Sequence, residues 1–584
     1  MSPLTFIFGL PLLAALLLAL IPRNFRFVIR SLALLATFSS MVIAIVMFWK
    51  FSSIEMVRHG FQFQQPQAWS PHSLPSFHVG VDGINLGLIV MGAIVAFAAT
   101  CVSRRIQTRE KEFYILLMLM AGGILGAFAS LDLVYFYGFH ELALVPTFIM
   151  IGVWGRGDNK NFAAYQITLY LSVGALLVLL GLLALYLQLP PGQRTFDIVA
   201  LTNYFQTRPI GAEAELWIFP LLLFGFGILV SLWPFHTWAP PGYGAAPTAT
   251  AMMHAGVVKK FGLYGLIRIA LPLMPIEAAK WVPILAFLCL GNIIYCGLVA
   301  MRQRNLNLLI GNSSVAHMGF AFLGLASLST IGISGTIFIM VAHGFLAALT
   351  FALSGYLDEE LKTLDIAEMG GLLRHLPFVG TAMIMAMLAG CGLPGFANFP
   401  GEMMVLFGSW DRYPVVVVIA IWGALVIGGV YMLRAIRNIW HGEKSWPAIA
   451  DPANAWRKLP YVLLLACLIL LGCFPSLLTD SFRNSVEPVA RMASGEAALA
   501  LKPARRLPRP AAPGAAPQPE PVAKPTNEVP RLSATNAAPQ SARGPVARRN
   551  VIGQPALPVK PTNEPPPPAA TNAAPQPAPP TPSR

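Results

Sequence analysis

Long apolar stretches separated by short polar segments dominate the first 480 residues of the chain. Each stretch runs for about 20 residues with few charges, which is the length a helix needs to cross about 30 Å of hydrocarbon. The pattern predicts an all-α polytopic membrane protein with 14 transmembrane helices. Their approximate spans are residues 3–21, 27–49, 81–103, 112–130, 132–153, 162–187, 216–238, 248–271, 280–301, 305–326, 330–357, 377–410, 413–436 and 459–477.

Helix-breaking residues interrupt two of these spans. The span 216–238 ends in "LWPFHTWAPPGYG", with prolines from Pro234 onward, and the span 377–410 contains "GLPG" from Gly392. Non-helical backbone at membrane depth is tolerated only where it is buried in protein or faces water. Two such breaks at matching positions in two halves indicate an inverted-repeat transporter. We therefore expect broken helices 7 and 12 within two inverted five-helix repeats, helices 4–8 and 9–13.

The composition changes near residue 480, where Pro, Ala and polar residues replace large apolar side chains. Such a segment cannot bury enough apolar surface to offset its ordering entropy, so we expect a disordered tail. The phrases "KPTNE" and "ATNAAPQ" each occur twice in it, 36 residues apart. The tail is interpreted as a dispensable appendage or as a weak tether to anionic surfaces. The expected domains are 1–110 (helices 1–3), 111–272 (first repeat), 273–437 (second repeat), 438–480 (helix 14) and 481–584 (tail).

The net charge of +14 has two separate sources. Residues 501–584 contain 11 Lys or Arg against 3 Asp or Glu, so most of the excess lies in the tail and predicts no nucleic-acid partner. In the membrane part, one set of alternate loops carries 18 Lys or Arg and the opposite set carries 6. Because cytoplasmic loops carry the excess of basic residues, we expect both termini on the opposite, periplasmic side.

Ionisable residues inside the apolar spans form a short set. Such residues are costly in a membrane and are functional candidates by default. Glu, Lys and His on successive helices supply the groups of a proton relay. We interpret His140 and His254 first as packing residues. Glu141 and Glu402 are expected to be functional, because a lone carboxylate gains nothing from lipid. The set comprises His140, Glu141, His236, His254, Lys259, Lys260, His317, His343 and Glu402.

The two adjacent lysines of "HAGVVKK" require separate interpretations. Adjacent residues of a helix point about 100° apart, so Lys259 and Lys260 do not both face one interior axis. We expect one of them to face a hydrated centre. The other is expected to pair with a carboxylate or to extend toward the membrane surface.

Several phrases of the sequence resemble a known family. "VDGINL", "WPFHTW", "APTATAMMHAGVVKKFGLYGLIRI", "NSSVAHMGF" and "CGLPGFANFPGEMMVLFGSW" are similar to the antiporter-like subunits of respiratory complex I, above all to the subunit M family of bacterial NADH-quinone oxidoreductase. The resemblance implies 14 helices, a charged axis along the membrane midplane, and proton translocation coupled to quinone reduction in other subunits. It also implies a bacterial inner membrane location, with homologous antiporter-like subunits and the lipid bilayer as partners.

The resemblance also assigns roles to individual residues. It implies that Glu141 is the helix-5 glutamate, Lys260 the central helix-8 lysine and Glu402 the helix-12 glutamate. His317 and His343 correspond to family histidines of helices 10 and 11. NADH, flavin, iron-sulfur clusters and quinone are expected in partner subunits. No cofactor is expected in this chain, which shows no Gly-rich dinucleotide motif, cysteine cluster or paired-histidine haem pattern.

The chain departs from the family pattern at four positions. The family's helix-7 lysine, the partner of the helix-5 glutamate, is replaced by Leu229, and a nearby proline by Ser231. Asn307 stands where helix 10 often has lysine, and Lys259 stands where the family usually has an apolar residue. Because a buried carboxylate without its cation is costly, we hypothesise that Lys259 partly substitutes for the missing lysine beside Glu141.

These departures leave alternatives to a complex I translocase subunit. One alternative is a subunit of a multi-subunit cation/proton antiporter, which shares the lysine and glutamate pattern. Another is a mainly structural, non-pumping paralogue, which the loss of the helix-7 lysine suggests.

Overall fold

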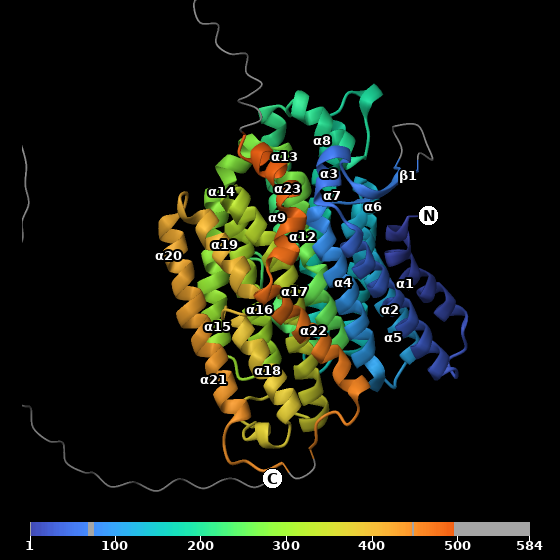
Figure 1. The fold of residues 1–584 in the computed structure, drawn as a ribbon, viewed down its shortest axis with the longest axis vertical. Coiled ribbons are helices and arrows are strands. Elements are labelled where there is room, and N and C mark those ends of the chain that lie inside the picture. Colours follow the sequence, from blue (N-terminus) through green and yellow to red (C-terminus); the bar gives the residue numbers. More distant parts are fainter. Residues whose placement is uncertain (1, 68–74, 447–448, 496–584) are drawn as a thin grey trace, which may run out of the picture. The chain divides into compact units, whose positions relative to one another are not determined.

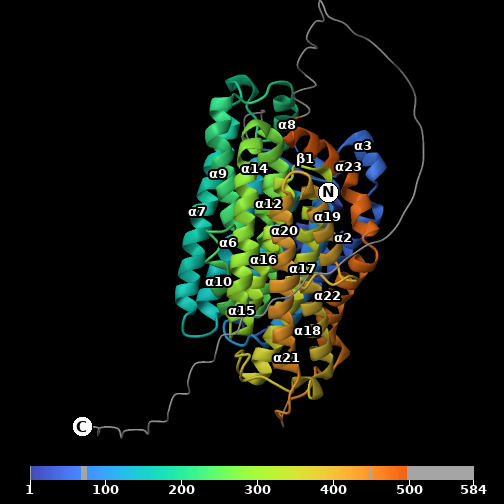
Figure 2. The ribbon, with the colours of Figure 1, turned by 90° about the vertical axis from the view of Figure 1, so that its left-hand side faces the viewer.

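In the computed structural model, residues 2–67, 75–446 and 449–495 are described. The described residues all belong to the first of two units of the chain, Met1–Leu507, and the second unit is Pro508–Arg584. The tail repeats predicted from the sequence lie outside the described residues. The first unit is a bundle of roughly parallel helices, which Figures 1 and 2 show from two sides.

Three N-terminal helices and a β-hairpin precede the central bundle. The hairpin pairs its two strands antiparallel, with Gln62 opposite Val81, and was not predicted from the sequence. The three helices are α1 (Pro3–Leu20), α2 (Arg26–Lys50) and α3 (Ser53–His59), and the strands are β1 (Gln62–Gln67) and β2 (Phe77–Val81). The long helix α4 (Gly83–Val102) and the 3-10 turn η1 (Ser103–Arg105) follow the hairpin.

The next group corresponds to the predicted spans 112–130 to 248–271. Its elements are α5 (Glu110–Ala129), α6 (Leu133–Trp154), α7 (Lys160–Leu187), η2 (Pro191–Gln193), α8 (Ile198–Thr207), α9 (Ala212–Val230), α10 (Ala239–Ala245), α11 (Thr248–Met253), the π-helix η3 (His254–Val258), α12 (Lys260–Gly265), the π-helix η4 (Leu266–Ala270) and α13 (Leu271–Leu273).

The last group contains the most deeply buried helices. α16 and α17 are 94% and 100% buried over their most apolar windows, so polar groups on them face protein and not lipid. The elements are α14 (Pro275–Leu290), the π-helix η5 (Gly291–Tyr295), α15 (Cys296–Arg302), α16 (Leu306–Ala326), α17 (Thr330–Leu361), η6 (Leu372–Arg374), α18 (Pro377–Gly390), α19 (Asn398–Trp410), α20 (Pro414–Trp422), the π-helix η7 (Gly423–Gly428), α21 (Gly429–Trp440), α22 (Ala455–Cys473) and α23 (Ser476–Ala493).

Within the described residues, 12 helices are long and apolar enough to cross a membrane. Two of the 14 predicted spans are not among these 12 helices. The span 248–271 divides into α11, α12 and α13 with π-helical turns between them, and the span 377–410 divides into α18 and α19. The chain is therefore a mostly helical polytopic membrane protein, and its interruptions fall on helices that carry ionisable residues.

The helix α23 corrects the predicted domain boundary at residue 481. Leu478, Phe482, Val486 and Val489 are buried at the three- and four-residue spacing of one helix face. This face packs against α4 and α17, so residues 481–493 belong to the folded bundle. The polar composition of the opposite face made this segment look like the start of the tail.

A buried ion pair connects the start of α4 to η4. The carboxylate of Asp82 accepts hydrogen bonds from the backbone N–H groups of Ile84 and Asn85, which caps α4. The same carboxylate lies 2.7 Å from a guanidinium nitrogen of Arg268, and both side chains are less than one tenth exposed. Arg268 also lies over the ring of Tyr264.

We predict that Asp82→Ala strongly destabilises the protein. The change removes a helix cap, worth about 1 kcal/mol, and leaves Arg268 as an unpaired buried charge, which costs about 3–5 kcal/mol. Asp82→Asn retains a capping oxygen and should have a smaller effect. The measurement is the aggregation temperature of the solubilised protein. Glu487→Gln, which breaks the exposed pair with Arg491, should change that temperature little. Equal aggregation temperatures for all three variants would contradict a stabilising role of the ion pair between Asp82 and Arg268.

Candidate functional site

Four of the predicted site residues form a buried line across the centre of the bundle. Lys260 begins α12, His343 lies on α17, His317 on α16 and Glu402 on α19. All four are nearly fully buried. The line passes from α12 through α17 and α16 to α19.

Lys260 is held at the junction between the π-helix η3 and α12. Its Nζ donates to the carbonyl oxygen of Ala255 at 2.6 Å and lies 2.8 Å from Nδ1 of His343. An ammonium donates a hydrogen bond to a neutral imidazole, and a protonated imidazole donates to a neutral amine. This contact therefore accommodates one proton on either residue.

The π-helical turn explains how a lysine finds a backbone acceptor in the membrane interior. In η3 the N–H of Lys259 bonds to the carbonyl of His254, five residues earlier. This wider turn displaces the backbone from the α-helical ladder, as single π turns do at functional sites. The carbonyl of Ala255 becomes an acceptor for the Lys260 side chain.

Lys259 is also buried, but it points to a different helix. Its Nζ donates to the hydroxyl of Ser314 at 2.7 Å and to the Ser314 carbonyl at 3.2 Å, and it lies over the ring of Tyr243. The two lysines diverge, as expected for adjacent helical residues. The expected carboxylate partner is not found: no hydrogen bond or ion pair joins Lys259 to Glu141 in the described ranges.

His317 lies between the lysines and Glu402. Its Nδ1 is 2.7 Å from the carbonyl oxygen of Ser313, and its Nε2 is 3.0 Å from that of Gly390. Because carbonyls only accept, a neutral ring donates to one of them and a doubly protonated ring to both. The ring centre lies 5.7 Å from that of His343, and Nε2 lies 3.9 Å from Oε1 of Glu402.

The break between α18 and α19 shapes the site around Glu402. Gly392 has a φ of +68°, and a Cβ atom there would lie 2.5 Å from Oε2 of Glu402. Glycine is therefore required for two reasons: a left-handed backbone and close approach to the carboxylate. Gly395, with a φ of +96°, has open space at the equivalent position.

Two small cavities lie on either side of His317. One, of about 20 Å³, lies between His317, Glu402 and Tyr431. The other, also about 20 Å³, lies between His317, His343 and Ser314. A cavity of this size with polar groups in its wall is large enough for one water molecule. Water in these positions would connect groups that do not touch directly.

Glu141 lies apart from this line, on α6. Its side chain is 30% exposed, and its Oε1 lies 3.4 Å from Nδ1 of the buried His140. The His140 ring stacks on Phe261 at a centroid distance of 3.9 Å. His254 is close enough to His140, Lys259 and Lys260 for their charges to act on its ring. The two histidines interpreted first as packing residues are therefore close to ionisable groups, His140 to Glu141 and His254 to the lysines.

The break after α9 is closed by the side chains of Asn292 and Trp238, which were not among the predicted site residues. Ser231 has a left-handed φ of +77° and ends the helix. The amide of Asn292 donates to the Ser231 carbonyl, and its oxygen accepts the Trp233 N–H, both at 2.8 Å. The Trp238 indole donates to the carbonyl of Ile228. A buried asparagine in an apolar helix was the only available signal.

Ser313, Ser314 and Tyr431 were also missed as site residues. The Tyr431 hydroxyl donates to Ser313 at 3.0 Å, and Ser313 lies 3.4 Å from Nδ1 of His317. Ser313 and Ser314 lie in "NSSVAH". Short polar side chains of this kind are common in membrane helices and gave no distinct pattern. In the part of the chain that the structure describes, no group of three or more His, Cys, Asp or Glu is arranged to hold a metal ion.

Two broken helices around a buried line of lysine, histidine and glutamate are typical of antiporter-like membrane subunits. Residues 130–428 match the family "NADH:quinone oxidoreductase/Mrp antiporter, TM", and the chain belongs to this family. Among its relatives is NADH-quinone oxidoreductase subunit M of Rickettsia typhi, 33% identical over 460 residues, which cover 78% of this chain and 91% of the relative.

Other relatives and solved structures agree with this assignment. F(420)H(2) dehydrogenase subunit M of Methanosarcina mazei is 33% identical over 439 residues, or 74% of this chain and 88% of the relative. A chain of respiratory complex I from Thermus thermophilus has a TM-score of 0.74 at 27% identity and covers 85% of this chain and 99% of its own. The Mrp complex of Dietzia sp. DQ12-45-1b, with a TM-score of 0.73 at 17% identity and coverages of 85% and 98%, shares the fold.

Proposed function

We propose that this chain is the proton-translocating subunit M of a complex I type NADH-quinone oxidoreductase. It would couple quinone reduction in partner subunits to proton movement through its own buried residues. The observation that carries the proposal is the line from Lys260 through His343 and His317 to Glu402. NADH, flavin, iron-sulfur clusters and quinone would belong to partner subunits.

The distances along this line support proton transfer controlled by neighbouring charges. The 3.9 Å between His317 and Glu402 corresponds to about 4 kcal/mol between unit charges at an effective dielectric constant of about 20. That energy changes a proton equilibrium by roughly a thousandfold. Protonation of Glu402 would therefore release a proton from His317. The contact between His343 and Lys260 would pass the change along the line.

The first half of the proposed relay differs from the family pattern. Leu229 is buried in α9 and provides no charge. His140 contacts Glu141, and His254 is within reach of the charges of His140, Lys259 and Lys260, so we assign the two histidines the connecting role of the missing helix-7 lysine. Lys259 would add a second cation to the centre of the relay through Ser314, without pairing directly with Glu141.

The proposed arrangement extends to the membrane and the partner subunits. The end of the bundle where α1, α4 and α17 end carries most of the loop arginines, and we assign it to the cytoplasm. Both termini would then lie on the periplasmic side of a bacterial inner membrane. The partly exposed Glu141 on α6 would mark the face for a homologous antiporter-like subunit. The two breaks, after α9 and after α18, support two inverted five-helix repeats, residues 111–272 and 273–437.

An antiporter subunit is the second candidate, because the matched family also includes Mrp antiporters. The deciding experiment is purification of the native complex and identification of the chains that migrate with it. Quinone-reducing and iron-sulfur subunits are expected for the complex I type. Cation/proton antiporter subunits without redox partners would favour the alternative.

We predict that Glu402→Gln abolishes most of the proton translocation that depends on this subunit. The amide retains the shape of the side chain but cannot bind or release the proton. The measurement is NADH-driven acidification in proteoliposomes containing the assembled complex. Glu213→Gln, at an exposed position at the start of α9, is the control and should pump normally. Intact pumping by Glu402→Gln would favour a structural, non-pumping paralogue.

We predict that Gly392→Ala impairs pumping more than Gly395→Ala. Both changes place a Cβ on a left-handed backbone, but only the first places it against the carboxylate of Glu402. We expect a loss of at least fivefold for Gly392→Ala and less than twofold for Gly395→Ala. The rates are normalised to the amount of assembled complex. Equal losses would show that the backbone conformation alone matters.

We predict that Lys259→Met reduces pumping even though Lys260 remains. Methionine approximates the length of the stem but removes the charge that acts on His254. Ser314→Ala, which removes the hydroxyl acceptor and keeps the lysine, should have a smaller effect. The measurement is the number of protons translocated per quinone reduced. An unchanged ratio for Lys259→Met would exclude Lys259 from the relay.

A further inference from the structure

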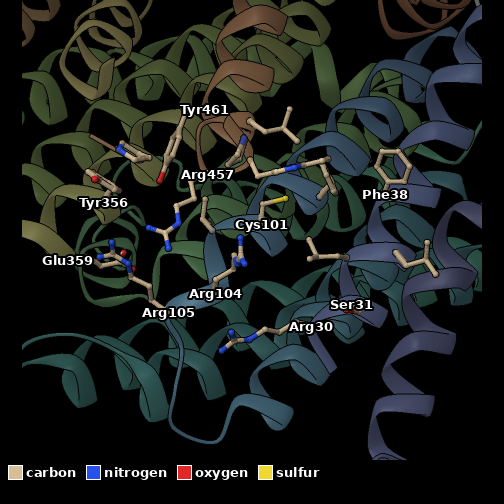
Figure 3. A pocket seen from close by; sticks show the side chains of 18 residues that line it. Arg30, Ser31, Phe38, Cys101, Arg104, Arg105, Tyr356, Glu359, Arg457 and Tyr461 are labelled. Carbon is tan, nitrogen blue, oxygen red and sulfur yellow. The ribbon is translucent and has the colours of Figure 1, made fainter. Parts of the chain in front are cut away.

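A large cavity opens at the basic end of the bundle, away from the proposed relay. Its volume is about 700 Å³, within the range of about 300–1,000 Å³ typical of small-molecule sites. The first half of α2, the end of α4 with η1, the end of α17 and the start of α22 form its wall. Figure 3 shows four arginines gathered on one side of it, Arg30, Arg104, Arg105 and Arg457.

Only some of these arginines have carboxylate partners. Arg30 pairs with the buried Glu110 beside the cavity, and Arg105 pairs with Glu359 at 3.0 Å and with Glu360 at 2.6 Å. The side chains of Arg104 and Arg457 have no ion pair or hydrogen bond in the described part of the chain. Like charges held close together repel each other, so this wall attracts an anion. Arginine also binds phosphate oxygens in a bidentate geometry.

The rest of the wall is apolar and faces the lipid. Leu35 and Phe38 on α2 are 62% and 46% exposed, and Phe97 on α4 lies behind them. Trp456, at the start of α22, is 76% exposed beside Arg457. Tryptophan favours the level of the lipid headgroups. The wall of the cavity thus has cationic groups at the helix ends and, next to them, an apolar surface along the helices.

We propose that this cavity binds an anionic phospholipid from the adjacent leaflet. Arg104 and Arg457 would bind the phosphate, and the acyl chains would lie along Leu35 and Phe38. A free phosphate ion would use only the cationic half of the wall and leave the apolar half unexplained. Basic pockets between transmembrane helices are suited to lipid headgroups. Because α22 is only 22% buried over its most apolar window, the lipid would attach it to α2 and α4.

The test uses membranes that contain the assembled complex and two photoreactive lipids. One is a phosphatidylglycerol and the other a phosphatidylcholine, each with the same diazirine-bearing chain. Labelled peptides are located by mass spectrometry. We expect phosphatidylglycerol to label residues 31–38 and 97–101 at least fivefold more than phosphatidylcholine does. The double variant Arg104→Gln and Arg457→Gln should lose this preference. The double variant Arg302→Gln and Arg304→Gln, at the same end of the bundle but outside the cavity, should retain it.

Three results would overturn the proposal. Equal labelling by the two lipids would show that the arginines do not select the headgroup. Displacement of the lipid by millimolar inorganic phosphate would indicate a site for the free anion. Crosslinks from these residues to a partner chain in place of lipid would show that a protein segment fills the cavity. None of these readouts depends on proton translocation, so the lipid site stands or falls independently of the proposed function.

Discussion

Keeping charge inside an apolar helix bundle is the constraint on which the rest of the structure depends. An unpaired charge at the bilayer centre costs about 2.5–3.5 kcal/mol even on insertion scales. Lys260 meets this constraint with the Ala255 carbonyl and His343, and Lys259 meets it with Ser314. Each solution takes its acceptors from backbone released by a π turn or from small polar side chains on a buried helix. The irregular backbone is therefore part of the chemistry of the site.

The same constraint explains the two broken helices. A break exposes backbone groups that water cannot reach, so another side chain has to bind them. After α9, Asn292 and Trp238 take this role, and the break is sealed. After α18, the Gly390 carbonyl is bound by His317, and Gly392 leaves room for Glu402. The first break is held by neutral partners and the second by titratable ones, so the second is the one in contact with the proposed proton path.

The sequence predicted those parts of the fold that depend on long apolar runs and strong helix breakers. It located most spans, both breaks, and the buried Lys260, His343, His317 and Glu402. It missed features that depend on contacts between distant segments. The π turns of η3 and the hydrogen bond from Lys259 to Ser314 follow from packing and have no local signature. The apolar face of α23 was hidden in a polar segment, and the arginine cavity joins residues 30, 104 and 457, which only the fold brings together.

The proposed relay uses histidines because Leu229 stands where the family resemblance implies a helix-7 lysine. A lysine ammonium has three donors to satisfy in the membrane interior, whereas a histidine needs only one partner for each ring nitrogen. His140 is supported by stacking on Phe261 and contacts Glu141, and His254 lies beside the lysines. Two neutral residues that accept a proton in turn cost less to bury than a permanent cation does. In the proposed relay, Lys259 adds charge at the centre, and His140 and His254 take the connecting role toward Glu141 that a helix-7 lysine would have.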